Sequence, residues 1–272
     1  AGLWVFVVDD GSAPDAARLL RSLESPGVVV SRLEVNQGKG GAVVEGFRLA
    51  RESGFTHAVQ VDADGQHDLD AIPSLLAAAR ENPDALIAGR PVFDRSMPLG
   101  RRIGRWITHV WVWIETLSTR IGDSMCGFRV YPLAAVDLVL RTARVGRRMD
   151  FDTEIIVRLA WLGTPIVEVP VRVTYPPGNS SNFRMWADNV RISWMHTRLV
   201  CGMLLRLPSL LRPANKATPW WRLPERGGAF GLRMMLAIYR LLGRRVCAAM
   251  LVPVAGGFFL AGRRQRAASF DY

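Results

Sequence analysis

Apolar runs alternate with segments of helical periodicity along the first third of the chain. Four short apolar runs predict buried strands, at residues 4–8, 28–34, 58–61 and 85–88. Three segments between them carry apolar residues at helical spacing and predict helices, at residues 14–25, 41–53 and 72–81. Strands that alternate with helices are typical of a mostly parallel sheet with helices on both faces, so we predict an α/β fold.

From residue 105 onward the pattern becomes mainly helical. An apolar and aromatic stripe predicts a helix over residues 105–121, and its members are Trp106, Val110, Trp113, Ile114, Leu117 and Ile121. The elements expected next are a loop at 122–131, a helix at 152–162, a strand at 166–174 and one long or two shorter amphipathic helices at 184–211. The stripe follows the basic stretch RRIGR, so it predicts contact with an anionic membrane surface, although packing against the sheet would give the same period.

Composition points to an anionic partner. The chain has 272 residues, of which 49% are hydrophobic, and a formal net charge of +11. The arginines of the later half stand mostly among Trp and Leu without any DNA- or RNA-reading motif, which favours a membrane surface and argues against nucleic acid. The three cysteines, Cys126, Cys201 and Cys247, are far apart and odd in number. We therefore expect no disulfide and no zinc site, and a reducing cytoplasm.

A crowd of carboxylates follows the third predicted strand. The stretch VDADGQHDLD holds four within nine positions, at Asp62, Asp64, Asp68 and Asp70, and like charges repel unless a cation lies among them. Asp62, Asp64 and Gln66 are spaced by two, so in an extended segment their oxygens point the same way and suit Mg²⁺ or Mn²⁺ together with substrate phosphates. A solvated acidic turn is the alternative, and we prefer it for Asp68 and Asp70, as helix caps.

Two further motifs lie where strands end and helices begin. VFVVDDGS places Asp9 and Asp10 after the first strand, where a carboxylate can accept hydrogen bonds from a ribose or a base; a turn capped by Asp10 or Ser12 is the alternative. NQGKGGA opens the second helix, and its glycines and amides suit an anion. It is not a Walker A loop, because Gly40 follows Lys39. A plain glycine-rich turn would leave Lys39 unexplained.

These motifs together resemble family 2 glycosyltransferases of the GT-A fold, and most closely the dolichyl- or polyprenyl-phosphate mannosyl- and glucosyltransferases. Besides the three stretches above, the matching motifs are AGR at 88–90, DSMCGFRVY at 123–131 and DFDTEIIVRLAWLG at 150–163. They stand in the family's order over residues 1–200, which we expect to form the glycosyltransferase domain. The family's first strand, with its P-x-Y-N nucleotide loop, is expected to precede Ala1.

The resemblance implies roles for the candidate residues. Nucleotide and donor contacts fall to Asp9, Asp10, Asp62 and Arg90, together with Lys39 of the glycine-rich loop, the metal to Asp62, Asp64 and Gln66, and the acceptor phosphate to Arg129. Asp64 is also expected to be essential for catalysis. A hydroxyl acceptor would need a base, for which Asp152 is the candidate and Glu154 the next; acids at a helix N-terminus would account for both equally well. A lipid-phosphate acceptor is already anionic and needs little base.

The end of the chain resembles a different protein family. Residues 220–272 resemble the opening of the lipid A lauroyl/myristoyl acyltransferase family, and 201–219 is expected to be a linker. An uncharged run at 246–262 is short for a membrane span and is interrupted by Pro253, so a re-entrant or interfacial helix is favoured. The resemblance implies a glycosyltransferase fused to an acyltransferase.

The expected function is inverting, metal-dependent transfer of a sugar from a nucleotide-diphosphate sugar to a polyprenyl-phosphate or glycolipid acceptor. It is expected at the cytoplasmic face of a bacterial inner membrane. One alternative is a lipid acyltransferase fusion whose first domain mainly binds nucleotide sugar, but the intact acidic strand ends argue against an inactive domain. The other is a nucleotidyltransferase, and the GFR loop followed by an acidic helix favours sugar transfer instead.

Overall fold

A computed structural model describes residues 3–93, 99–174 and 184–210 of the chain. The chain divides into two compact units, Ala1–Leu207 and Pro208–Tyr272, and the fold described below is that of the first. The expectations for residues 211–272 lie outside the described residues and stay predictions. They are the end of the linker, the acyltransferase-like segment from 220 and the membrane segment at 246–262.

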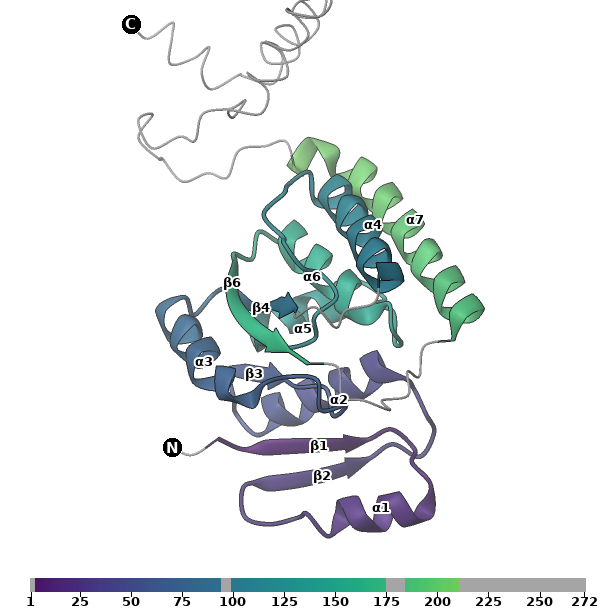
Figure 1. Ribbon diagram of the computed structural model, residues 1–272. Coiled ribbons are helices and arrows are strands. Elements are labelled where there is room, and N and C mark those ends of the chain that lie inside the picture. Colours follow the sequence, from purple (N-terminus) through teal and green to yellow (C-terminus); the bar gives the residue numbers. More distant parts are fainter. Residues whose placement is uncertain (1–2, 94–98, 175–183, 211–272) are drawn as a thin grey trace, which may run out of the picture. The chain divides into compact units, whose positions relative to one another are not determined.

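The strands form two sheets in the described part of the chain (Figure 1). The first pairs β1 (Val5–Asp9) with β2 (Val28–Arg32) in parallel. The second has the order β3-β5-β4-β6, and its strands are β3 (His57–Gln60), β5 (Arg129–Pro132), β4 (Leu86–Phe93) and β6 (Ile166–Val173). β4 and β6 are parallel, whereas β5 runs antiparallel to both neighbours. The predicted α/β fold is confirmed, with mixed pairing in the second sheet.

Most helices lie close to their predicted places. They are α1 (Pro14–Arg21), α2 (Lys39–Glu52), α3 (Ile72–Glu81), α4 (Leu99–Thr116), α5 (Leu133–Thr142), α6 (Phe151–Trp161) and α7 (Met185–Leu210), with a 3₁₀ turn η1 (Leu69–Ala71) before α3. The segment at 184–211 forms one long helix, α7. Because α7 continues to Leu210, the first half of the predicted linker at 201–219 is helical.

The sequence pattern misses β5 and α5. The loop predicted over 122–131 is wrong from Arg129 onward, where the chain enters β5, and α5 follows at Leu133. All four residues of β5 are buried, so they lack the alternation that marks a half-exposed strand. The glycines and polar residues just before β5 also signal a turn, which hides so short a strand.

The second sheet separates two apolar clusters. Leu86 and Ala88 of β4 belong to one cluster with residues of α2, α5 and α6, such as Phe47 and Ile155. Ile87, between them in sequence, belongs to the other cluster, which includes residues of α3. Alternate strand residues face opposite sides of a sheet, so helices cover both faces of the second sheet, as predicted.

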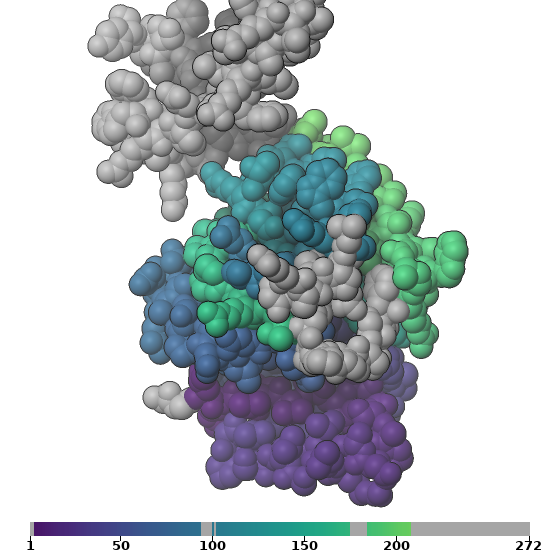
Figure 2. Space-filling model, in the orientation of Figure 1, coloured from purple at the N-terminus to yellow at the C-terminus, as the bar shows by residue number. Residues whose placement is uncertain are grey.

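Helix α4 turns much of its predicted stripe toward solvent. Its exposed apolar residues are Ile103, Trp106, Ile107, Trp111 and Ile114, with Leu117 just beyond its end. Trp113, by contrast, is half-buried and donates from Nε1 to the Ile121 carbonyl over 2.8 Å, and Ile121 is buried. The expectation that the stripe forms one face is therefore wrong for these two residues. In Figure 2 the teal side chains of α4 form part of the upper surface.

No helix among the residues that the structure describes is long and apolar enough to cross a bilayer.

Asp123 ties α4 to the segment that leads into β5. Its buried carboxylate accepts hydrogen bonds from Arg105 Nε at 2.5 Å and Nη2 at 2.9 Å, and from the amides of Met125 and Cys126 at 2.9 and 2.7 Å. Burial alone would raise the pKa of Asp123, but His109 and Arg105 outweigh it and hold this pKa well below its usual range.

We expect Asp123→Asn to lower the free energy of unfolding by roughly 3–5 kcal/mol near pH 7, because the substitution leaves a largely buried guanidinium without its carboxylate. The pKa of Asp123 is lower in the folded chain than the unfolded value of 3.8, so its stabilisation is present above that value and is lost as the pH falls below it. Urea unfolding of the wild type and the variant at a series of pH values tests both statements.

The matched control is Asp15→Asn, whose carboxylate on α1 is 89% exposed and which should change stability by no more than about 0.5 kcal/mol. A difference between the wild type and Asp123→Asn that stays constant from neutral pH to pH 3 would contradict the assignment.

Candidate active site

Four polar side chains meet at the carboxyl end of β3. Gln60 is the last residue of β3 and pairs in register with Arg129 of β5. Asp62 follows two residues later, Lys39 begins α2, and Asp152 lies in the first turn of α6. The fold thus brings together segments that are up to 113 positions apart in the sequence.

Two carboxylates share the same pair of donors. The Lys39 ammonium lies 2.6 Å from Asp62 Oδ2 and 2.5 Å from Asp152 Oδ2. The Gln60 amide nitrogen lies 3.0 Å from Asp152 Oδ1 and 3.3 Å from Asp62 Oδ1. Asp62 and Asp152 are therefore bridged twice, once by a cation and once by a neutral amide.

The charges of this cluster stabilise one another. Burial alone would raise the pKa of Asp62, but its interactions with His67 and Lys39 hold that pKa far below the usual range. Burial would lower the pKa of Lys39, but Asp152 and Asp62 raise it instead. Both groups are therefore charged at neutral pH, although neither is fully exposed.

The two acidic residues after β1 shape the neighbouring loops. Asp9 is buried and accepts from the Ser12 amide at 2.8 Å and from Arg32 Nη1 at 2.6 Å, and the Ser12 contact is the main cause of its lowered pKa. Asp10 accepts from the amides of Gln37 and Gly38 at 2.6 and 2.7 Å. Asp10 therefore fixes the glycine-rich loop that presents Lys39, and a nucleotide contact by either carboxylate stays a prediction.

The predicted metal ligands lie on the turn after β3. Asp64 is exposed and accepts from the Gln66 amide at 3.0 Å across Gly65, whose φ is +70°. The residues that the structure describes contain no cluster of three His, Cys, Asp or Glu side chains able to hold a metal ion. The hard oxygens of Asp62 and Asp64 nevertheless fit Mg²⁺ or Mn²⁺, which bind through one or two carboxylates and fill the other positions with phosphates and water.

The two predicted phosphate ligands, Arg90 and Arg129, differ in their exposure to solvent. Arg90 is exposed on β4. Arg129 is fully buried and donates to the carbonyls of Ser124 and Asp152, each over 2.7 Å. Because these donors are engaged inside the protein, the geometry does not support the predicted contact of Arg129 with the acceptor phosphate. Arg129 instead positions the backbone of Asp152.

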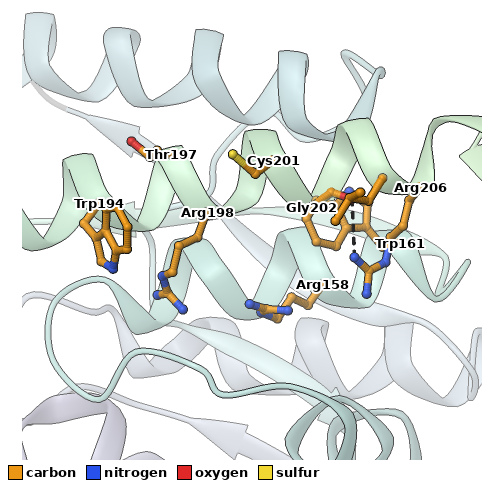
Figure 3. Close-up of a pocket in the computed structure, with 9 residues that line it drawn as sticks. Arg158, Trp161, Trp194, Thr197, Arg198, Cys201, Gly202 and Arg206 are labelled. Atoms are coloured by element: carbon orange, nitrogen blue, oxygen red, sulfur yellow. Dashed lines mark hydrogen bonds between the residues drawn. The ribbon is translucent and has the colours of Figure 1, made fainter.

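Glu154, the second candidate base, does not belong to the cluster. It is fully buried and accepts from the Gly146 amide at 2.8 Å, from Arg158 Nη2 at 2.6 Å and from Arg198 Nη2 at 3.0 Å. Its two arginine partners line a cavity of about 360 Å³ between α6 and α7, together with Trp161 and others (Figure 3). Glu154 therefore anchors α7 to α6.

Three residues near the cluster were not identified from the sequence. Gln60 is a buried polar residue inside an apolar run, which is itself a signal. His67 packs on Phe128 with ring centroids 5.0 Å apart, and its Nε2 lies 3.6 Å from Asp62 Oδ2. Gly127 is tightly enclosed, since a Cβ there would lie 2.6 Å from Gln60 Nε2 and 2.8 Å from Asp62 Oδ2. Nothing in the local sequence shows the last two contacts.

The α/β fold, with acidic residues after two of its strands, is of the GT-A type that glycosyltransferases use. The solved structure of S. aureus TarS, residues 1–349, has the same fold, with a TM-score of 0.50 and 16% sequence identity. The match covers 74% of this chain and 56% of the TarS chain. Residues 3–135 match Glycosyl transferase family 2.

Curated relatives agree with this family. An undecaprenyl-phosphate mannosyltransferase of Micrococcus luteus is 35% identical over 176 residues, which are 61% of this chain and 70% of the relative. A dolichyl-phosphate beta-glucosyltransferase of Dictyostelium discoideum is 28% identical over 211 residues, 71% of this chain and 63% of the relative. The chain therefore belongs to glycosyltransferase family 2, as the motifs indicated.

We expect Gly127→Ala to abolish most sugar transfer while the protein stays folded. The added methyl group would lie 2.6–2.9 Å from Gln60 Nε2, Asp62 Oδ2 and Lys39 Nζ, so it would displace the ends of these side chains at a cost of roughly 1–3 kcal/mol. Steady-state assays with nucleotide sugars and a thermal melt measure the two effects.

Gly46→Ala on α2 is the matched control, because a Cβ there would meet only Val8 Cγ2 at an ordinary 3.7 Å. Wild-type turnover in Gly127→Ala would show that the arrangement of the cluster does not matter for catalysis.

Proposed function

We propose that this glycosyltransferase moves a sugar from a nucleotide-diphosphate sugar to a polyprenyl phosphate or a related lipid-linked acceptor, with inversion at the anomeric carbon. The observation that carries the proposal is the pair of carboxylates, Asp62 and Asp152, that Lys39 and Gln60 hold together. The names of the relatives support the acceptor class, since the two described above act on undecaprenyl phosphate and dolichyl phosphate.

The donor lies on the side of Asp62 in this proposal. Asp62 and Asp64 would hold Mg²⁺ or Mn²⁺, which would supply positive charge to balance the negative charge that develops on the departing diphosphate. Asp9 and Asp10 contact the nucleotide, and Asp10 also keeps Lys39 in place through the Gln37 and Gly38 amides. The exposed guanidinium of Arg90 pairs with the donor phosphates.

The acceptor lies on the side of Asp152. An acceptor oxygen bonds to the anomeric carbon as the bond from that carbon to the diphosphate oxygen breaks, and attack from the opposite side inverts the configuration. A phosphate acceptor brings its own negative charge, so no proton needs to be removed. If the acceptor is a hydroxyl, Asp152 takes its proton, because Gln60 and the Arg129-bound backbone fix its position.

The lipid acceptor places the enzyme at a membrane surface. The exposed tryptophans and isoleucines of α4 supply an apolar, aromatic face of the kind that settles at a bilayer interface. The net charge of +11 adds attraction to an anionic leaflet. We therefore propose peripheral association with the cytoplasmic face of the membrane, with α4 against the lipid.

Asp64→Ala should reduce sugar transfer by at least about a hundredfold without unfolding the protein, because Asp64 is exposed and its loss removes a metal-binding oxygen. Product formation from a panel of nucleotide sugars, with polyprenyl phosphate as acceptor, measures the effect. Asp70→Ala, on the same acidic stretch but in η1, is the control and should retain activity. Normal turnover in Asp64→Ala with a continuing need for metal would refute the metal assignment.

Membrane binding should depend on the exposed face of α4. We expect the double variant Trp106→Ser and Trp111→Ser to sediment less with anionic vesicles at high salt, where charge attraction is screened and apolar contact dominates. Both side chains are exposed, at 62% and 41%.

Leu19→Ser is the control for this experiment, because Leu19 is 68% exposed on α1, away from α4 in Figure 1. Equal sedimentation of the double variant and the wild type at every salt concentration would exclude α4 as the membrane contact.

A further inference from the structure

The backbone from which the Lys39 side chain extends is held firmly in place. Lys39 follows Gly38, whose φ is +87° and whose Cβ, if present, would lie 2.7 Å from the Arg147 carbonyl. The Gly38 amide is bound by Asp10 at 2.7 Å. Because the loop cannot shift easily, the side chain of Lys39 leaves α2 from a fixed point.

The other end of Lys39 is equally confined. Its nitrogen contacts Asp62 and Asp152 at 2.6 and 2.5 Å, and a Cβ on Gly127 would lie 2.9 Å from it. Lys39 therefore neutralises Asp62 with a positive charge that belongs to the protein. A divalent cation on the same carboxylate would lie within a few ångströms of this ammonium and would be repelled by it.

We infer that Lys39 is an internal counter-ion that makes divalent-cation binding at Asp62 depend on the nucleotide diphosphate. The inference rests on the proposed function and assigns Lys39 a positioning role in addition to contact with the donor. Without a diphosphate, the ammonium satisfies Asp62 and keeps a second cation out. The diphosphate oxygens supply the negative charge that allows ammonium and metal to be close neighbours.

This arrangement couples the two ligands. If the diphosphate raises the affinity for the metal, the metal must raise the affinity for the diphosphate by the same factor. The consequence for the enzyme is that metal and donor bind together. In the donor-free protein, Asp152 and Asp62 stay joined through Lys39 and Gln60.

Mn²⁺ binding to the full chain tests the inference, by calorimetry or by electron paramagnetic resonance of the free ion. In the wild type, Mn²⁺ alone should bind weakly, and UDP or GDP should tighten its binding by roughly tenfold or more. In Lys39→Met, Mn²⁺ alone should bind roughly tenfold or more tightly than to the wild type, because two adjacent carboxylates lose their counter-ion. A structural defect alone would weaken binding, so a gain of affinity is specific.

Arg48→Met is the matched control. Arg48 lies on the same helix and pairs with Glu45 and Glu52 at the surface, so this variant removes one positive charge without touching the cluster. Its affinity for Mn²⁺ alone should stay within about twofold of the wild type, because exposed charges are screened. Lys39→Arg, which keeps the charge, should also bind Mn²⁺ alone weakly. If Lys39→Met does not fold, Lys39→Gln keeps a donor for both carboxylates and should show the same gain.

The outcomes separate this inference from the proposed function. If nucleotide tightens Mn²⁺ binding but the neutral Lys39 variants bind Mn²⁺ alone no more tightly than the wild type, the role of Lys39 is refuted and metal-assisted transfer stands. If neither UDP nor GDP tightens Mn²⁺ binding in the wild type, the metal assignment and the role of Lys39 both fail.

Discussion

The buried guanidinium of Arg129 holds together three segments on which the active site depends. It lies on β5 beside Gln60 of β3 and donates to the carbonyls of Ser124 and Asp152. A charge without solvent contact destabilises a fold strongly unless hydrogen bonds compensate it, and the two terminal nitrogens of Arg129 find these bonds in the segment before β5 and at the start of α6. Through this arrangement β3, β5 and α6 place Asp152 opposite Asp62, and the charge of Lys39 then has two partners.

Buried ion pairs also attach the two outer helices. Asp123 holds Arg105 of α4, and Glu154 holds Arg198 of α7. Glu115, near the end of α4, is hydrogen-bonded to His196 of α7 over 2.7 Å. Because polar contacts secure the inner side of α4, its outer side is free to carry exposed apolar residues, as Trp106 shows. Attachment to the core and exposure of apolar side chains thus use different faces of α4.

The sequence predicts those helices and strands that carry a recognisable pattern of apolar residues within their own residues. The apolar runs of β1 to β3 and the helical spacing of α2 and α3 are local patterns, and the structure reproduces them. β5 gives no such signal, because its burial depends on β3 and β4, between which it lies. The same reason explains Arg129. An arginine in a motif of a phosphate-handling family suggests an exposed ligand, and only the packing of β5 shows that its donors face inward.

The candidate site shows the same division between local and distant information. Asp62 and Asp64 could be found because they crowd together in sequence, whereas the contact of Lys39 with Asp152 joins residues 113 positions apart. Gly127 is the clearest case. Unlike Gly38, it is not among the glycines with positive φ, so another residue could adopt its backbone conformation. What excludes a side chain is the space already taken by Gln60, Asp62 and Lys39. The glycine of the GFR stretch is therefore a requirement of the ionic cluster, and a requirement of that kind cannot be read from local sequence.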